Sequence, residues 1–177
     1  MNIRQASAAD VSEMLAIYAP YVASTPVSFE TVVPSVEEFG ARIAKALDRW
    51  QCLVAERDGV IAGYAYGSTH RERAAYRYSV EVTAYVHARF HRQGIGSALY
   101  RRLFDDLIAR GYCTAFAGIT LPNDASVGLH RSVGFEPIGV FRRIGWKFDR
   151  WHDVAWMQRT LRDQPVAALS TRVDTSR

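Results

Sequence analysis

The sequence predicts an α/β (α+β) single domain, in which a mixed, mostly antiparallel sheet is flanked by helices. Three observations lead to this prediction. Asp58-Gly59 separates two apolar runs, which is a strong signal for a two-residue hairpin turn. The runs "FEPIGVFRRIG" and "WHDVAWMQRT" predict a second strand pair near the end of the chain. Between them, "YSVEVTAYVH" and "YCTAFAGIT" flank a helical segment, which indicates a strand–helix–strand unit.

The N-terminal third predicts a short strand, two helices and the first hairpin. "NIRQA" is expected to be extended, and a helix capped by Ser7 should follow over 7–24. Its apolar face repeats at helical spacing: Val11, Met14, Leu15, Tyr18 and Val22. Ser35 with Glu38 forms a capping-box pattern and starts a second helix. The hairpin strands are expected near 51–57 and 60–68.

The remaining chain predicts alternating strands and helices. "YSVEVTAYVH" alternates cleanly, with Val80 and Val82 on one face and Glu81 and Tyr85 on the other. A glycine loop leads into a helix that ends near Arg110, and a short helix over 123–134 follows the next strand. The domain should cover residues 1–162. The polar tail 163–177 has no period, and we expect it to be disordered.

Length and composition indicate a single cytoplasmic domain. The chain has 177 residues, of which 49% are hydrophobic, and no apolar run approaches the roughly 20 residues needed to span a bilayer. The start lacks the apolar stretch of a signal peptide. We therefore expect no membrane partner. Cys52 and Cys113 lie in apolar runs and are predicted to be buried strand thiols in a reducing compartment. They and the five histidines form no ligand pattern, so no metal is expected.

The net charge of +4 leaves three interpretations open. The surface could be mildly basic, the protein could bind a polyanionic cofactor, or it could bind nucleic acid. The sequence contains no lysine-rich arm, zinc-finger spacing or aromatic RNA-binding signature. We therefore expect no nucleic-acid partner. A basic nucleic-acid-binding module remains the alternative from another class, and steep salt dependence of binding would favour it.

The stretch "FHRQGIGSALYRRLFDDL" predicts a glycine loop at the start of an amphipathic helix. Unpaired N–H groups at a helix N-terminus attract phosphate, and glycines let the ligand approach the backbone closely. The loop matches neither of two familiar phosphate-binding loops. A Walker A loop needs Gly-Lys-Ser/Thr, which is absent, and a Rossmann loop needs a third glycine where Leu99 stands. A dehydrogenase is therefore a weak interpretation.

Four further stretches carry a family resemblance: "STPVSFET", "AYRYSVEVTAYV", "LPNDASVGLHRSVGFEPIGVFR" and "GWKFDRWHDVAWMQR". With the strand–loop–helix unit, they resemble the GCN5-related N-acetyltransferase (GNAT) superfamily, and within it the phosphinothricin and methionine sulfoximine acetyltransferases. The resemblance extends from the N-terminus to about Leu161. It implies a GNAT fold and acetyl-CoA as co-substrate. One departure is His91, where the family usually has Gln or Arg.

The resemblance also implies the cofactor contacts. In the superfamily, the strand before the loop splays from its neighbour, which frees backbone groups for pantetheine and for the thioester carbonyl. The implied contacts are the backbone of Tyr85 and Val86, the loop residues His91, Arg92, Gln93, Gly94, Ile95 and Gly96, and Asn123. Asn123 is also well suited to cap the short helix, and both roles can hold together.

Two residues carry the chemistry that the resemblance implies. Periodicity alone favours a solvated or Arg-paired Glu81, but this residue matches the family's general base. A base is needed because an amine at neutral pH is mostly an unreactive ammonium. His130 stands where many superfamily members have a tyrosine that points at the cofactor sulfur, and where this subfamily has a histidine. It acts either as the acid for the departing thiolate or as a structural residue.

The resemblance places the acceptor near Phe29, Arg73 and Tyr76, because an Arg fork suits the carboxylate of an amino-acid-like substrate. Arg71 stands two residues before Arg73, and Trp146, Lys147 and Trp151 line either the site or a partner interface. The implied function is acetylation of the α-amine of phosphinothricin, methionine sulfoximine or methionine sulfone, with herbicide resistance as one consequence. The alternative acceptors are a protein N-terminus or a polyamine. The family commonly forms homodimers, and a homodimer is expected here.

Overall fold

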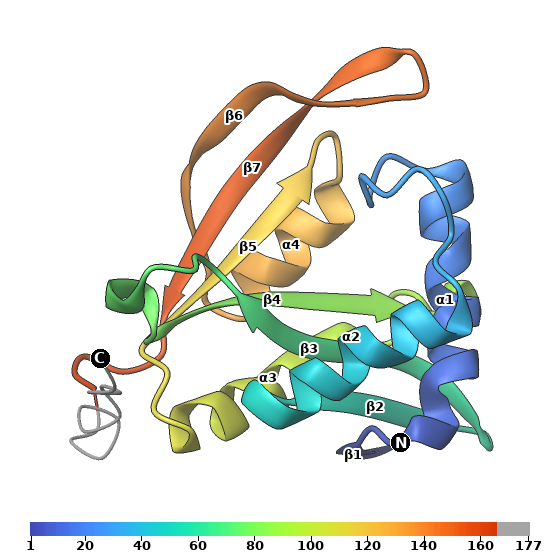
Figure 1. Cartoon of the computed structure of the whole chain (residues 1–177), viewed down its shortest axis with the longest axis horizontal. Helices are drawn as coiled ribbons and strands as arrows, with labels where there is room; N and C mark the ends of the chain where they lie inside the picture. The colour runs from blue at the N-terminus through green and yellow to red at the C-terminus, as the bar shows by residue number, and fades with distance from the viewer. Residues whose placement is uncertain (166–177) are drawn as a thin grey trace, which may run out of the picture.

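The computed structural model describes residues 1–165, which fold around one seven-stranded sheet with the order β1-β2-β3-β4-β5-β7-β6 (Figure 1). Among the described strands, only the β4–β5 pair is parallel. The strands are β1 (Asn2–Gln5), β2 (Cys52–Arg57), β3 (Val60–Thr69), β4 (Ser79–Val86), β5 (Thr114–Thr120), β6 (Glu136–Lys147) and β7 (Arg150–Thr160). The predicted fold class and the predicted order of elements are confirmed.

Local signals account for the helix boundaries. The helices are α1 (Val11–Ser24), α2 (Val36–Arg49), α3 (Ile95–Ala109) and α4 (Asp124–Ser132), with short 3-10 helices η1 (Ala8–Asp10), η2 (Ala74–Tyr76) and η3 (Ala88–Phe90). The capping box of α2 is present, because the Ser35 N–H donates to Glu38 and the Glu38 N–H donates back to Ser35 Oγ. Asp58 and Gly59 have φ values of 53° and 78°, as the predicted hairpin turn requires.

The alternation of β4 assigns the helices to the two faces of the sheet. On the face that carries Glu81 and Tyr85, Tyr85 packs edge-on against Tyr18 of α1, and its strand neighbour Tyr64 contacts Phe39 of α2. On the other face, Ile95 of α3 lies against Gly63 of β3. Leu129 of α4 lies against Gly96 of α3. Helices α1 and α2 therefore cover the Glu81 face, and α3 and α4 cover the opposite face.

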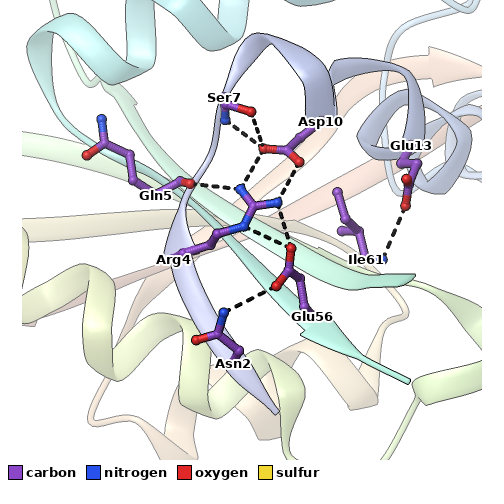
Figure 2. Close-up of polar contacts among 8 residues, drawn as sticks. All are labelled: Asn2, Arg4, Gln5, Ser7, Asp10, Glu13, Glu56 and Ile61. Atoms are coloured by element: carbon purple, nitrogen blue, oxygen red, sulfur yellow. Dashed lines mark hydrogen bonds and ion pairs between the residues drawn. The ribbon is translucent and has the colours of Figure 1, made fainter. Parts of the chain in front are cut away.

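The N-terminal strand is held by an ion network around Arg4 (Figure 2). The Arg4 guanidinium donates to both carboxylate oxygens of Asp10, at 2.8 and 2.7 Å, and to Glu56 of β2 at 2.8 Å. Asp10 also accepts from the N–H and the hydroxyl of Ser7. Because Arg4 lies on β1 and Asp10 on η1, the network fixes the entry of the chain into α1.

The structure places the two cysteines differently. Cys52 is buried in β2 as expected, but Cys113 precedes β5 and is only half-buried, so the prediction of a second buried strand thiol was wrong. Most of the tail predicted to be disordered lies outside the described residues. Among the helices that the structure describes, none combines the length and apolarity needed to cross a bilayer.

Candidate active site

The central feature of the site is an opening between β4 and β5. The two strands pair only at Ser79–Thr114, Val80–Ala115 and Glu81–Phe116. Beyond Glu81, β4 stays paired with β3 and β5 stays paired with β7, so the two strands diverge (Figure 1). The remaining residues of β4, 82–86, therefore turn one edge of their backbone toward a gap instead of toward a strand.

The backbone of Val86 faces this opening. The His87 N–H donates to Ala62 of β3 at 2.9 Å, and by strand alternation the groups of Val86 point the other way. The Val86 carbonyl accepts from the Tyr21 hydroxyl at 2.8 Å and from His91 Nε2 at 2.9 Å. His91, the one departure from the resemblance, thus connects the glycine loop to the end of β4.

The glycine loop forms the start of α3, and its two glycines serve different purposes. Gly94 caps α3 with φ +79°, and a glycine cap has no side chain to satisfy the N–H groups of the first helical turn. A Cβ on Gly96 would lie 2.9 Å from Leu129 Cδ2, so this glycine permits the close packing of α3 on α4. Within residues 1–165, no atom beyond the chain neighbours lies within 4 Å of the position that a Gly94 Cβ would take, so the loop is open there, whereas Gly96 serves the packing.

The other loop residues differ in what they can offer a ligand. The Ile95 side chain is buried in the core, so only its N–H is available. Arg92 and Gln93 are exposed, and Gln93 Nε2 donates back to the Arg89 carbonyl at 3.1 Å. The loop therefore combines free N–H groups with exposed guanidinium groups, which suits a phosphate-bearing ligand.

Glu81 is half-buried in the middle of the sheet, between Ser68 of β3 and Phe116 of β5. One carboxylate oxygen, Oε1, lies 3.0 Å from His70 Nδ1. Burial raises the pKa of Glu81 above its usual range, and the hydrogen bond and charge of His70, together with the charge of Arg71, oppose this rise. A carboxylate with a raised pKa beside an opening is a candidate proton acceptor.

His130 is buried in α4, with both ring nitrogens engaged. Nδ1 donates to the Ser126 carbonyl at 2.7 Å, because a carbonyl oxygen can only accept. Nε2 lies 3.0 Å from the hydroxyl of Tyr100, which is itself fully buried in α3. Burial lowers the pKa of His130 below its usual range, which favours the neutral ring; with its hydrogen on Nδ1, that ring accepts from the Tyr100 hydroxyl at Nε2.

Asn123 caps α4 as predicted. Its Oδ1 accepts from the Ser126 N–H at 3.1 Å. This contact fixes the start of the helix that carries His130. The cap uses only the amide oxygen, so the NH₂ group remains available for a ligand.

Phe29 lies on a loop between α1 and α2 that is tied down at several points. Lys147, buried at the end of β6, donates its three N–H groups to the carbonyls of Val22, Thr25 and Ser28 at 2.6–3.0 Å. The ring of Phe29 lies against Gly145, where a Cβ would overlap it. Lys147 therefore fixes the loop and does not line a surface, whereas Trp146 and Trp151 are exposed.

Arg73 and Tyr76 lie on the exposed segment around η2. Tyr76 approaches the site, because its ring meets the edge of His70 with centroids 5.8 Å apart. Within residues 1–165, no hydrogen bond or ion pair holds the Arg73 side chain. The structure thus brings Tyr76 to the Glu81 region, and leaves the Arg73 guanidinium in solvent.

Sequence reasoning missed His70 and Tyr21. His70 stands two residues after Ser68, the strand partner of Glu81, so strand alternation could have assigned it to the same face. Tyr21 gave no such signal, because it lies on α1, 65 residues from Val86. As for metals, no group of three or more His, Cys, Asp and Glu side chains in the described part of the chain could hold an ion.

Comparisons with known proteins agree with this geometry. Residues 3–156 match the family model described as an acetyltransferase (GNAT) domain. The chain is 40% identical over 159 residues to phosphinothricin N-acetyltransferase of Streptomyces viridochromogenes, covering 90% of this chain and 87% of the relative. It is 35% identical over 162 residues to the L-methionine sulfoximine/L-methionine sulfone acetyltransferase of Salmonella typhimurium, covering 91% and 95%.

A solved structure is similar over nearly the whole length. It is a GNAT superfamily phosphinothricin acetyltransferase from Sinorhizobium meliloti in complex with acetyl-CoA. The TM-score is 0.89 at 34% identity, and the match covers 94% of this chain and 93% of that one.

Proposed function

The chain belongs to the GNAT acetyltransferase family, and on that premise we propose that it transfers the acetyl group of acetyl-CoA to the α-amine of a small amino-acid analogue. Phosphinothricin, methionine sulfoximine and methionine sulfone are the proposed acceptors, since the relatives named for them match over most of their length. Herbicide resistance would follow from acetylation of phosphinothricin.

The opening between β4 and β5 is the observation that carries the proposal. It leaves the backbone of residues 82–86 without a strand partner along one edge, which fits the amide-bearing pantetheine arm as an added strand would. The opening leads to the loop His91–Gly96, whose free N–H groups and exposed Arg92 fit a pyrophosphate. Asn123 would add its amide on the α4 side. Acetyl-CoA thus fits the residues present.

In the proposed mechanism, Glu81 removes a proton from the acceptor ammonium. The free amine then attacks the thioester carbonyl carbon, and a C–N bond forms while the oxygen becomes an oxyanion. The N–H of Val86, on the open edge of β4, stabilises that charge. The C–S bond then breaks, the second proton of the nitrogen passes to the thiolate so that CoA leaves as the thiol, and Glu81 returns its proton to water. Holding both reactants in one opening supplies much of the acceleration.

The proposed base and the proposed acid lie on opposite faces of the sheet. Glu81 lies on the face covered by α1 and α2, and α4 with His130 lies on the opposite face. An acetyl group in the opening would therefore have the base on one side and His130 on the other. We propose His130 as the acid for the departing thiolate. Its one N–H is donated to Ser126 and its Nε2 accepts from Tyr100, so Nε2 must first take up the proton that the acceptor nitrogen releases before it can deliver one to the thiolate.

The acceptor is proposed to enter from the Glu81 face. Arg73 would pair with its carboxylate, Tyr76 would pack beside it, and Phe29 would close over it. Replacement of Arg73 by Gln should raise KM for the acceptor about 10- to 100-fold, because a charge-assisted hydrogen bond is lost. The KM for acetyl-CoA should stay the same. Arg77→Gln, at a neighbouring exposed position, is the matched control and should change neither constant.

Thiol release from acetyl-CoA, followed with a chromogenic disulfide, tests the proposed function. The acceptors are phosphinothricin, methionine sulfoximine, methionine sulfone, spermidine and a short peptide with a free N-terminus. Rapid release with the first three is expected. Release with spermidine or the peptide alone would replace the acceptor class, and no release together with no acetyl-CoA binding would contradict the proposal.

The variant Glu81→Gln tests the base. Gln keeps the shape of the side chain but cannot accept the amine proton, so turnover should fall at least 100-fold. Acetyl-CoA affinity should remain within about two-fold, because no cofactor contact is assigned to this side chain. Wild-type turnover in this variant would contradict the assignment of Glu81.

We propose further that the protein is a cytoplasmic homodimer. Both cysteines are free, which suits a reducing compartment. The β6–β7 hairpin extends beyond the rest of the sheet (Figure 1) and exposes a run of large apolar side chains. The members are Ile138, Val140, Phe141, Ile144, Trp146, Phe148 and Trp151. Exposed large apolar side chains gathered on one hairpin are typical of a protein–protein interface.

A further inference from the structure

His70 lies beside Glu81 because of the strand register. Ser68 of β3, Glu81 of β4 and Phe116 of β5 are direct neighbours across the sheet, so their side chains share one face. His70 follows two residues after Ser68, just beyond the end of β3, and continues on that face. Its Nδ1 lies 3.0 Å from Glu81 Oε1.

Aromatic side chains fix the His70 ring. It stacks on Phe116 with centroids 4.2 Å apart and an interplanar angle of 9°. Tyr76 and Trp156 meet it edge-on, at 5.8 and 6.2 Å. The side chain is only 12% exposed, whereas that of Glu81 is 30% exposed. The imidazole thus has a set orientation, and the carboxylate keeps an open side.

The contact determines which atom carries the hydrogen. An ionised carboxylate only accepts, so Nδ1 must be the donor. In the part of the chain that the structure describes, only Oε1 of this carboxylate has a hydrogen-bond partner. Oε2 is left for a ligand.

We propose that His70 is a positioning residue for Glu81, whose Nδ1–H holds Oε1 so that Oε2 faces the acceptor amine. The inference rests on the proposed function, in which Glu81 accepts the amine proton. His70 touches neither reactant in this scheme. When Oε2 takes the proton, Oε1 keeps its hydrogen bond and the geometry is retained for the next turnover.

The charges around the pair support this role. Burial raises the pKa of Glu81, and the His70 hydrogen bond is the strongest effect that opposes the rise. Arg71, on the segment after β3, contributes a weaker attraction. Tyr76 of η2 is the other titratable group beside the ring, while β5 and β7 contribute the uncharged Phe116 and Trp156.

Two substitutions separate positioning from packing. His70→Phe keeps an aromatic ring on Phe116 but removes the donor. His70→Asn loses the ring, but its Nδ2 stands as many bonds from Cβ as Nδ1 does, so the donor is kept. The measurement is kcat/KM for phosphinothricin between pH 5 and pH 9, with acetyl-CoA affinity measured beside it.

We expect His70→Phe to lower kcat/KM about 10- to 100-fold at pH 7, as the loss of a hydrogen bond to a charged group predicts. The acidic limb of its pH profile should move to higher pH. Without the His70 donor the Glu81 pKa rises, so the active carboxylate form is already lost at a higher pH than in the wild type. His70→Asn should restore both quantities in large part, and neither change should alter acetyl-CoA affinity by more than about two-fold.

Equal losses in the two variants with an unmoved acidic limb would overturn the inference, since the ring would then serve packing alone. Active Glu81→Gln would overturn the proposed base and this inference together. If Glu81→Gln is inactive but His70→Phe keeps the wild-type kcat/KM, this inference alone is overturned. A readout without turnover is ¹⁵N NMR of labelled histidine at pH 8. His70 should carry its proton on Nδ1, and an Nε2–H tautomer would overturn the inference.

Discussion

At the scale of single residues, the site depends on side chains whose hydrogen bonds leave little choice of role. His130 is the clearest case. Its Nδ1–H donates to the Ser126 carbonyl and its Nε2 accepts from the Tyr100 hydroxyl, and both contacts lie inside the α3–α4 layer. Such a ring can act as the proposed acid, or it can hold two helices together, and the two roles predict different responses to substitution.

We predict that His130→Asn separates these roles. Asn keeps a donor at the position of Nδ1 for the Ser126 carbonyl, but it cannot carry a proton to the thiolate. If His130 is the acid, kcat should fall about 10- to 100-fold in this variant. The free energy of unfolding should fall by about 1–3 kcal/mol in either case, because the buried Tyr100 hydroxyl loses its acceptor. Urea denaturation and steady-state kinetics give the two quantities.

The alternative has an opposite signature. A histidine that only joins α3 and α4 would leave kcat near the wild-type value in His130→Asn and would lose stability in His130→Ala. That result would remove His130 from the mechanism and leave the thiolate to be protonated by water.

At the scale of elements, charged side chains connect segments that are far apart in the sequence. The network of Figure 2 joins β1, η1 and β2 through Arg4, and its carboxylates are held ionised. The Arg4 guanidinium and the two donors of Ser7 lower the pKa of Asp10 from 3.8 to about 2. Because Asp10 is buried, this lowering contributes to stability.

The pH dependence of unfolding tests this contribution. Since the folded chain lowers the Asp10 pKa, the unfolded chain binds the proton more readily, and the stabilisation is present above about pH 4 and lost as the pH falls toward 2. Its size is about 2 kcal/mol. We predict that Asp10→Asn lacks this part of the acid-induced loss in urea unfolding.

The matched control is Asp105→Asn, at an exposed position on α3. It should lose stability in acid as the wild type does. If Asp10→Asn and the wild type lose stability in parallel between pH 5 and pH 2, the network does not stabilise the fold.

Lys147 provides the second link between elements. It joins the end of β6 to the loop that carries Phe29, and its ammonium satisfies three carbonyls. We predict that Lys147→Met lowers the free energy of unfolding by about 2–4 kcal/mol, because buried carbonyls lose their donors. The KM for the acceptor should rise more than the KM for acetyl-CoA, because the Phe29 loop loosens.

Lys45→Met, at an exposed position on α2, is the control for loss of an amine and should change stability by no more than about 0.5 kcal/mol. Equal effects of the two substitutions would show that the three contacts of Lys147 do not hold the loop.

At the scale of the whole molecule, the sheet is continuous at its middle and divided toward one end. The pairs Ser79–Thr114 to Glu81–Phe116 hold its two halves together, and the divergence beyond them creates the opening. The β6–β7 hairpin belongs to the second half, together with its exposed aromatic side chains. The same hairpin carries Lys147, so the proposed dimer surface and the Phe29 loop are mechanically connected.

We predict that the wild type sediments as a dimer at micromolar concentration and that Trp146→Glu with Trp151→Glu yields a monomer. These two rings pack against each other and are 56% and 47% exposed, so charges there should prevent an apolar interface without disturbing the core. Val60→Glu, at an exposed valine on the β2–β3 hairpin, is the control and should remain dimeric. A monomeric wild type would contradict the prediction.

The sequence by itself determined the order of elements, the fold class and the positions of the caps and turns. Ser35 with Glu38, Asp58-Gly59 and Gly94 act on residues within a few positions, so their geometry follows from local chemistry. The alternation of β4 likewise placed Glu81 on the other face of the strand from Val80 and Val82. The family resemblance, and not this pattern, indicated that Glu81 is a base.

Only the tertiary structure decided what surrounds these residues. His70 meets Glu81 across 11 residues, Tyr21 meets Val86 across 65, and Lys147 meets Val22 across 125. Such contacts depend on strand register and on how helices pack, which no local pattern encodes. The same reason explains Cys113, whose apolar neighbours predicted burial although the strand begins one residue later. Local signals act over one turn or one strand, whereas the site is assembled from segments that only the folded sheet brings together.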